Sequence, residues 1–412
     1  MKRSKLFVLM LLASLVLSGI SQVFAQDTLP KVDLVMWSSD DDVNNVALKA
    51  QFDKWAALRS PGSTLDIQNK PTEDLRNDFQ TAGLAGSGLP DLILGPNDPI
   101  GVFVTNGLLL PLDDLFDTSK YPTNLAAGQL DGVTYAIPIT SGNHLMLMYN
   151  KSLVPTAPDT WDEMIATAKK VTADHPDVVG LAYNETEPFW FVPIVFGLGG
   201  TVWDADGKYS INTQPWIDAL KLVHDLKFVD KVIPTECDYA CADNFFKEGS
   251  VAMIFNGDWA INDYLDTTKS PALGADNLGL APWPTLSNGE RPKPYTAGKF
   301  ISIPVGVEGD KLNAAVDFVT WATTDPEAVK AISIDTGRLP AAAGVTVDEK
   351  AFPVLAESAA ALATGVGMPS DGLRCMWDSV KPNLQAVYSD SMSAEDAASE
   401  SQIAAEDCLA NS

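Results

Sequence analysis

Histidine and basic residues are scarce in this chain of 412 residues, and their scarcity excludes several functions. Lysine and arginine together number 28, against 54 aspartates and glutamates, which gives a formal charge of −26. Binding to nucleic acid or to an anionic membrane surface requires a basic face, so we expect neither partner. The three histidines, His144, His175 and His224, are scattered, and none lies in the H-E-x-x-H spacing of a zinc protease.

Catalytic and cofactor motifs are also missing. The sequence contains no G-x-S-x-G elbow, no P-loop and no dinucleotide fingerprint. The acidic run that begins at Asp40 does not fit a calcium loop, because Asn45 and Gln51 stand where glycine and glutamate are required. We therefore expect no metal and no cofactor. This run lies between a strand and a helix, so its carboxylates either cap the helix or point into a cleft, and both interpretations stay open.

Long apolar runs are absent after the first 25 residues. Lys2, Arg3 and Lys5 precede an apolar stretch over 6–17, and a small residue, Ala25, follows. Because a membrane-spanning helix needs about 20 apolar residues, this order predicts a signal peptide over 1–25 that is cleaved near Ala25. We expect export to the periplasm or the extracellular face, with an uncleaved anchor helix as the alternative. No cysteine lies near the cleavage site, so we expect no lipid anchor.

The chain has only four cysteines, which an oxidising compartment would pair into disulfides. Three pairings are possible, and pairing nearest neighbours predicts Cys237–Cys241 and Cys375–Cys408, the second of which would tie the tail to the body. A thiolate zinc site is the rival interpretation, but no histidine is near and the spacings are not those of zinc ligands.

Strand-like and helix-like segments alternate along the chain. Strands are predicted over 32–37, 65–67 and 90–94, with a helix between the first two that carries Leu48, Phe52 and Trp55 on one face. Alternation of this kind predicts an α/β fold, and the length predicts two domains. No flexible linker separates two halves, so we expect a hinge made of short crossovers.

Aromatic residues stand beside acidic ones in the second half of the chain. Glu187 precedes Phe189 and Trp190, Trp259 follows an Asn-Gly-Asp turn after a strand, and Trp377 follows Arg-Cys-Met. Sugars need this mixture, because their C–H faces stack on rings while their hydroxyls bond to polar groups. The alternative for each aromatic residue is an ordinary place in the core.

Several blocks occur in an order that resembles the extracellular solute-binding proteins of the maltose/maltodextrin type, which serve ABC importers. The blocks are P-D-L-I-L-G (90–95), G-L-L-L-P-L (107–112), M-Y-N-K (148–151), P-D-T-W-D-E (158–163), F-K-E-G-S-V-A-M (246–253) and G-D-W (257–259). The resemblance implies two α/β lobes, each a mainly parallel sheet flanked by helices, joined by hinge strands and closing on a sugar. It places the N-terminal lobe at 26–138 and 299–337 and the C-terminal lobe at 139–298 and 338–412. It also implies a monomer that delivers its sugar to a membrane permease.

The resemblance assigns ligand-binding roles residue by residue. Asp41, Asp98 and Glu187 match sugar-binding carboxylates, and Trp259 and Trp377 match stacking tryptophans. Asp42 and Trp190 are adjacent candidates.

At other positions the sequence departs from the family pattern. Phe189 replaces a tyrosine, Lys381 an arginine and Asn143 a glutamate. Gly95 stands where a stacking tryptophan is expected, and Pro99 where a basic residue is expected, so the bound sugar need not be maltose.

Two other functions fit the same residues. In a secreted carbohydrate-active enzyme, Glu187 and Asp98 would be an acid/base pair. The same fold could also bind a peptide, a polyamine or a metal complex.

Overall fold

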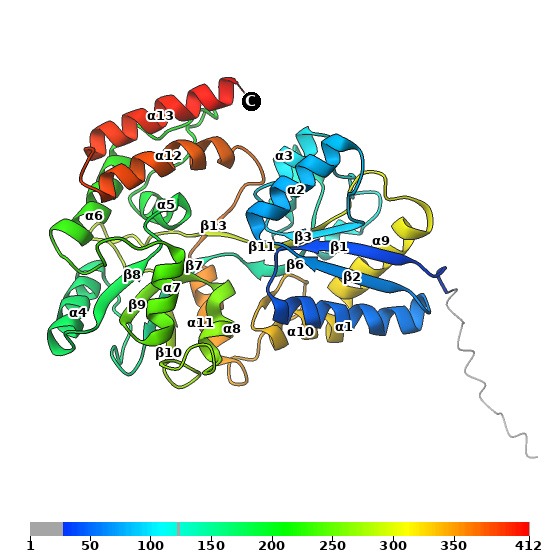
Figure 1. Ribbon diagram of the computed structural model, residues 1–412, viewed down its shortest axis with the longest axis horizontal. Helices are drawn as coiled ribbons and strands as arrows, with labels where there is room; N and C mark the ends of the chain where they lie inside the picture. The colour runs from blue at the N-terminus through cyan, green and yellow to red at the C-terminus, as the bar shows by residue number, and fades with distance from the viewer. Residues whose placement is uncertain (1–27, 122–123, 412) are drawn as a thin grey trace, which may run out of the picture.

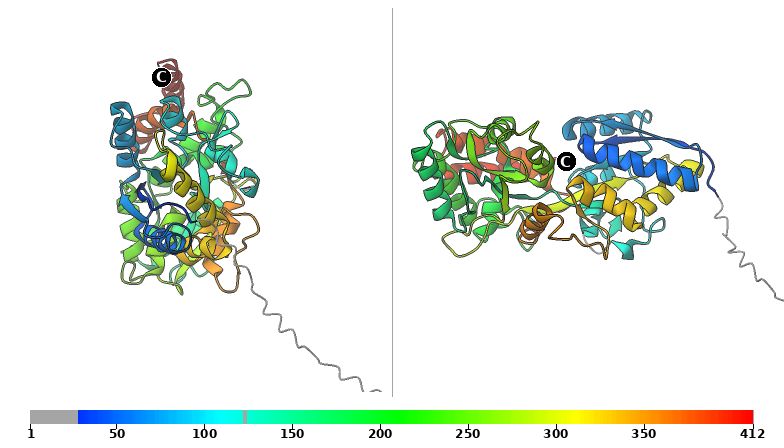
Figure 2. Two further views of the ribbon diagram at one scale, coloured as in Figure 1. Left: turned by 90° about the vertical axis from the view of Figure 1, so that its right-hand side faces the viewer. Right: turned by 90° about the horizontal axis from the view of Figure 1, so that it is seen from below.

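Two lobes lie side by side in the computed structural model, which describes residues 28–121 and 124–411. Extended strands pass between the lobes (Figures 1 and 2). The predicted signal peptide lies outside the described residues. Within the described part, no helix has the length and apolarity needed to cross a membrane.

The N-terminal lobe is built on a sheet with the strand order β12–β6–β11–β3–β1–β2, and β13 pairs with β11. Its strands are β1 (Asp33–Ser38), β2 (Thr64–Asn69), β3 (Leu92–Gly95), β6 (Ile137–Gly142), β11 (Tyr295–Ser302), β12 (Leu339–Pro340) and β13 (Val366–Gly367). The helices are α1 (Asp42–Arg59), α2 (Thr72–Ala85), α3 (Ile100–Thr105), α9 (Gly309–Thr324) and α10 (Pro326–Ile332), with short 3-10 turns η1 (Thr118–Lys120), η2 (Leu125–Gly128) and η4 (Ile334–Thr336). A small ribbon pairs β4 (Gln129–Leu130) with β5 (Val133–Thr134).

The C-terminal lobe is built on a sheet with the order β10–β7–β9–β8. Its strands are β7 (Leu145–Asn150), β8 (Val179–Tyr183), β9 (Val251–Gly257) and β10 (Leu278–Ala281). The helices are α4 (Trp161–Asp174), α5 (Pro188–Gly197), α6 (Gln214–Phe228), α7 (Tyr239–Glu248), α8 (Ile261–Leu265), α11 (Pro353–Leu362), α12 (Leu373–Tyr388) and α13 (Ala394–Ala410), and η3 (Asp258–Ala260) follows β9.

The two-lobed α/β fold confirms the prediction, but the expected predominance of parallel pairs is wrong. The first sheet has as many antiparallel pairs as parallel ones, because β11 is antiparallel to β3 and β6 and β12 is antiparallel to β6. In the second sheet, antiparallel pairs predominate. Only β8 and β9 are parallel there, whereas β7 is antiparallel to both β9 and β10. The cause is the hinge. Strand β6 continues into β7 across the lobes, so β7 runs away from the hinge while β9 runs back towards it. The predicted lobe boundaries stay a prediction.

Local sequence signals explain much of the packing. Phe52 and Trp55 are fully buried, and the Phe52 ring meets Phe318 at a centroid distance of 5.0 Å, which fastens α1 to α9. Thr160 and Glu163 form a complete capping box at the start of α4.

Both predicted disulfides are present. Cys237 and Cys241 are joined with their Cα atoms 5.2 Å apart, and Cys375 and Cys408 with theirs 5.6 Å apart. The second bond links α12 to α13, so it ties the tail to the C-terminal lobe as expected.

Candidate functional site

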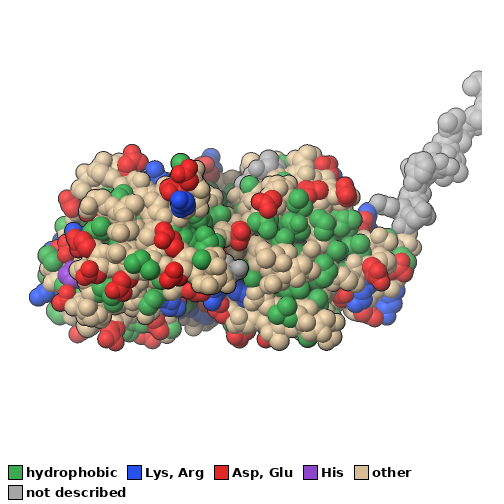
Figure 3. All heavy atoms as spheres, turned by 90° about the horizontal axis from the view of Figure 1, so that it is seen from above, with side chains coloured by type: hydrophobic (Ala, Val, Ile, Leu, Met, Phe, Trp, Pro, Cys, Tyr) green, Lys and Arg blue, Asp and Glu red, His purple; other side chains and the backbone are tan. Residues whose placement is uncertain are grey.

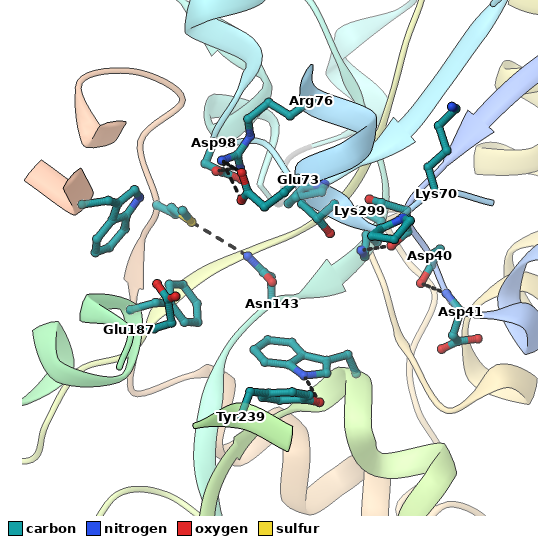
Figure 4. A pocket seen from close by; sticks show the side chains of 18 of the residues that line it. Asp40, Asp41, Lys70, Glu73, Arg76, Asp98, Asn143, Glu187, Tyr239 and Lys299 are labelled. Atoms are coloured by element: carbon teal, nitrogen blue, oxygen red, sulfur yellow. Dashed lines mark hydrogen bonds and ion pairs between the residues drawn. The ribbon is translucent and has the colours of Figure 1, made fainter. Parts of the chain in front are cut away.

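A cavity of about 900 Å³ opens between the two lobes (Figures 3 and 4). Its wall combines aromatic rings with charged side chains from both lobes. The residues that line it are Ser39, Asp40, Asp41, Asn69, Lys70, Pro71, Thr72, Glu73, Arg76, Pro96, Asp98, Asn143, Glu187, Phe189, Trp190, Tyr239, Trp259, Lys299, Arg338, Met368, Arg374, Trp377, Asp378 and Lys381.

Every ligand-binding candidate from the sequence except Asp42 lies on this wall. Asp42 is the first residue of α1, is exposed, and accepts a bond of 3.2 Å from the Asn69 amide. Its neighbour Asp41 does both things that the sequence left open. It caps α1 by accepting from the backbone of Asn44 at 2.8 Å, and it also lines the cavity.

Five aromatic side chains form a continuous wall on the C-terminal lobe. The Trp259 ring lies 6.2 Å from Phe189 and 5.9 Å from Trp190, and Phe189 lies 6.3 Å from Trp377. Tyr239 closes the group, because its hydroxyl accepts a 3.1 Å bond from the Trp259 indole. We call these five residues the aromatic wall. Flat faces of this kind suit the C–H faces of a sugar.

Glu187 and Lys381 form an ion pair at the edge of the aromatic wall. Glu187 directly precedes α5, which carries Phe189 and Trp190, whereas Lys381 and Trp377 both lie on α12. The pair therefore joins the two helices that supply most of the rings. An ion-paired carboxylate still accepts hydrogen bonds from hydroxyl groups on its free lone pairs.

Asp98 faces the aromatic wall from the N-terminal lobe, where Arg76 of α2 pairs with it (Figure 4). Burial raises the pKa of Asp98, although the nearby Arg76 acts in the opposite direction. Arg76 also bonds to Glu73 at 3.0 Å, and Glu73 lies 3.8 Å from Arg374 of the C-terminal lobe. A chain of charges thus runs across the cleft at this point.

A second charged group lies where the lobes meet. Arg338 is almost fully buried and lies 2.9 Å from Asp41, 3.4 Å from Asp40 and 3.5 Å from Asp258. Burial opposes its charge, but the three carboxylates outweigh that effect and raise the pKa of Arg338. The guanidinium therefore links two aspartates of the N-terminal lobe to one that follows β9.

Two further residues that line the cavity come from the chain segments that connect the lobes. Asn143 stands between β6 and β7 with a φ of 51°, and its amide lies 3.9 Å from the Met368 sulfur. Lys299 of β11 donates a 3.1 Å bond to the Ser39 carbonyl. Among the described residues, no carboxylate lies within ion-pairing distance of Lys299, so its remaining protons can serve an acceptor in the cavity.

Sequence reasoning missed several residues of the wall, chiefly Tyr239, Arg76, Arg338, Lys299 and Glu73. Tyr239 could have been suspected from the sequence, because it lies between Cys237 and Cys241 at the first position of α7. The others had no such local signal. Asp40 and Arg338, for example, are 298 positions apart, and only the fold brings them together.

The lining of the cavity suits an uncharged ligand that is rich in hydroxyl groups. The cationic side chains of Arg76, Arg338 and Lys381 pair with carboxylates that also line the cavity. The lining therefore presents no large net charge of either sign to a ligand. Rings on one side and polar groups on the other match the two kinds of surface that a sugar presents. In the described ranges, no group of three or more histidine, cysteine, aspartate or glutamate side chains is placed to hold a metal ion.

Comparison with known proteins adds three findings. The family model described as bacterial extracellular solute-binding protein matches residues 47–361. A solved structure of the maltose/maltodextrin-binding domain from Bdellovibrio bacteriovorus, bound to maltotriose, is 32% identical and has a TM-score of 0.82 over 92% of this chain and 100% of that one. The maltotriose-binding protein of Pyrococcus abyssi is 29% identical over 372 residues, which cover 87% of this chain and 78% of that protein.

Proposed function

This chain belongs to the bacterial extracellular solute-binding proteins, and we propose that it captures an oligosaccharide of the maltodextrin type in its interlobe cavity. The observation that carries the proposal is the aromatic wall, which faces Asp98 and Asp41 across about 900 Å³. A maltotriose complex of the relative from Bdellovibrio bacteriovorus supports the ligand class.

Capture proceeds by closure of the lobes. Sugar rings stack on Trp259 and Trp377 from one lobe, while Asp41, Asp98 and Glu187 accept hydrogen bonds from sugar hydroxyls. The ligand touches both lobes only when they are close, so it stabilises the closed state by its differential contacts. Each hydrogen bond to a carboxylate contributes about 1.5–3 kcal/mol.

The receptor acts outside the cytoplasm and passes its ligand to an ABC transporter permease. The family is extracellular, and the signal peptide predicted over 1–25 would direct export. The protein works as a monomer, and the chain crosses between its lobes near residues 138, 298 and 337, in or beside the strands β6, β11 and β12.

Binding without turnover is the activity that we propose. The carboxylates that could serve as an acid/base pair, Asp98 and Glu187, are each held by a cationic side chain. Long incubation of the protein with maltotriose, followed by chromatography of the products, tests this proposal. Intact maltotriose is expected, and accumulation of glucose or maltose would show an enzyme.

A thermal-shift panel tests the ligand class. The purified mature protein is heated with maltotriose, other oligosaccharides, amino acids and polyamines in parallel. A ligand present at 100 times its Kd stabilises the native state by about 2.7 kcal/mol, so a true ligand raises the melting temperature. We expect a rise with oligosaccharides alone. A rise only with a polyamine or an amino acid would refute the sugar assignment.

A further inference from the structure

The Cys237–Cys241 disulfide closes directly around a residue of the aromatic wall. Tyr239 lies between the two cysteines and is the first residue of α7. Its hydroxyl accepts the 3.1 Å bond from the Trp259 indole, and its ring lies 5.9 Å from Trp190. Each cysteine of the disulfide is thus two positions from Tyr239, whose side chain contacts two tryptophans of the aromatic wall.

The same disulfide also contacts the segment that carries Glu187. The Cys237 carbonyl accepts a 3.0 Å bond from the backbone N–H of Glu185, two residues before Glu187. Cys237 is buried, and the core that surrounds it includes Phe246 and Tyr264, with Trp259 packed at its edge. One covalent bond therefore fixes the start of α7 against both Trp259 and the loop ahead of α5.

Other contacts hold the chain on either side of this disulfide. The segment between α6 and α7 has no strand, although Val232 and Ile233 are buried in the core. The start of α7 has the Asp238 cap, whose carboxylate accepts from Cys241 at 2.9 Å, and the helix buries Ala242 and Phe246 further along. On α12, the buried side chains of Met376, Val380 and Leu384 anchor the helix, so we expect Trp377 to keep its place without the Cys375–Cys408 bond.

We propose that Cys237 and Cys241 are positioning residues for ligand binding: their disulfide holds Tyr239 so that it orients the Trp259 ring in the cavity. The affinity for ligand then depends on this bond, beyond any effect on folding. The inference rests on the proposed function for the identity of the ligand, but not for the arrangement of the wall.

Loop length separates a positioning role from a stabilising one. The stabilisation by a disulfide grows with the length of the loop that it closes. Cys237–Cys241 spans 4 positions, whereas Cys375–Cys408 spans 33. The short bond is therefore the weaker stabiliser, and the long bond supplies a matched comparison within the same lobe.

The test compares two double variants, Cys237→Ser/Cys241→Ser and Cys375→Ser/Cys408→Ser, with the unaltered protein. Maltotriose affinity is measured by calorimetry and the melting temperature by circular dichroism. We expect the first variant to lose affinity about tenfold, which corresponds to one lost hydrogen-bonded contact, with the smaller fall in melting temperature. The second should show the larger fall in melting temperature and an affinity changed less than about twofold. An unchanged affinity in the first variant would overturn the proposal.

A mutant cycle with Tyr239→Phe tests the route through the tyrosine. The phenylalanine keeps the ring but cannot accept the bond from Trp259. If the disulfide acts through Tyr239, removing both should weaken binding no more than the stronger single effect, because residues that act as one unit are not additive. Losses that multiply would contradict the proposed route.

One measurement is independent of the sugar. Hydrogen exchange of the Trp259 indole N–H, followed by NMR in the unliganded protein, reports its bond to Tyr239. Exchange should become faster in Cys237→Ser/Cys241→Ser and not in Cys375→Ser/Cys408→Ser. If no sugar binds the unaltered protein, the proposed function fails while this readout still decides the inference. Unchanged exchange in both variants would refute it.

Discussion

At the scale of single residues, a tryptophan that follows the end of a strand can be recognised in the sequence as a candidate for a ligand cavity. Trp259 lies in η3, two residues after the end of β9, and its partly buried ring lines the cavity. This signal could be seen in the sequence, as could Glu187 with its aromatic neighbours. Arg76 and Arg338 could not be predicted, because their partners Asp98 and Asp41 come from other elements and the pairs form only in the folded chain.

Trp259→Ala should lose most affinity for maltotriose while the protein stays folded. Deleting a central aromatic contact typically costs at least about 2 kcal/mol, which corresponds to about 30-fold in Kd. Calorimetry measures the loss, and circular dichroism reports the fold. Trp321→Ala is the matched control, because Trp321 packs against the core of the N-terminal lobe and does not line the cavity. Equal affinity in both variants would contradict the role of Trp259.

Glu185 predicts a dependence of stability on pH. Burial raises its pKa from 4.5 to about 7, with Lys227 opposing the shift and Glu236 adding to it. The native state therefore binds this proton more tightly than the unfolded chain. The contribution of Glu185 to the free energy of unfolding is fully present below about pH 4.5 and is lost as the pH rises through about 7.

Glu185→Gln removes this titration. The free energy of unfolding of this variant should exceed that of the unaltered protein by an amount that grows between about pH 5 and about pH 8, to at most about 3 kcal/mol, and its melting temperature should be higher accordingly. Thermal unfolding across this range measures it, and the exposed Glu349→Gln serves as control. A difference that does not vary with pH would show that Glu185 does not titrate there.

At the scale of elements, the hinge explains both what the sequence predicts and where it fails. The alternating pattern predicts strands and helices well, since each depends on local periodicity. The antiparallel pairing of β7 depends on where β6 leaves the first lobe, which no local pattern encodes. Strands β6 and β11 lie side by side in the hinge, and Gly298 faces Ser141 in their register.

Gly298→Ala should destabilise this hinge. A Cβ at Gly298 would meet the backbone carbonyl oxygen and carbon of Thr140, and this backbone has no room to yield. The backbone φ of 157° adds strain for any residue with a side chain. We expect a loss of about 2–3 kcal/mol, read from the midpoint of urea unfolding. Gly367→Ala, which meets no atom within 4 Å, should change stability by less than about 0.5 kcal/mol. Similar midpoints for both variants would contradict this account.

At the scale of the whole molecule, charge acts differently on folding and on binding. With a formal charge of −26, the acidic side chains repel one another in the compact folded state. A sugar is uncharged, so its binding involves no attraction between net charges that salt could screen. The acidity could be predicted from composition alone. The balance of charges in the cavity could not be predicted from composition, because it depends on which side chains the fold brings together.

Raising the salt concentration should therefore stabilise the fold without changing sugar affinity. The screening length falls from about 30 Å at 0.01 M to about 8 Å at 0.15 M. We expect the melting temperature to rise over this range and the Kd for maltotriose to change by less than about twofold. A falling melting temperature, or a Kd that follows the salt concentration, would argue that paired charges control folding or binding.

Titration calorimetry of the mature protein with maltotriose tests the central claim most directly. We expect saturable binding of one maltotriose per chain, in the cavity between the lobes. The absence of binding heat with maltotriose and with longer maltodextrins across several temperatures, in a protein that remains folded, would contradict it.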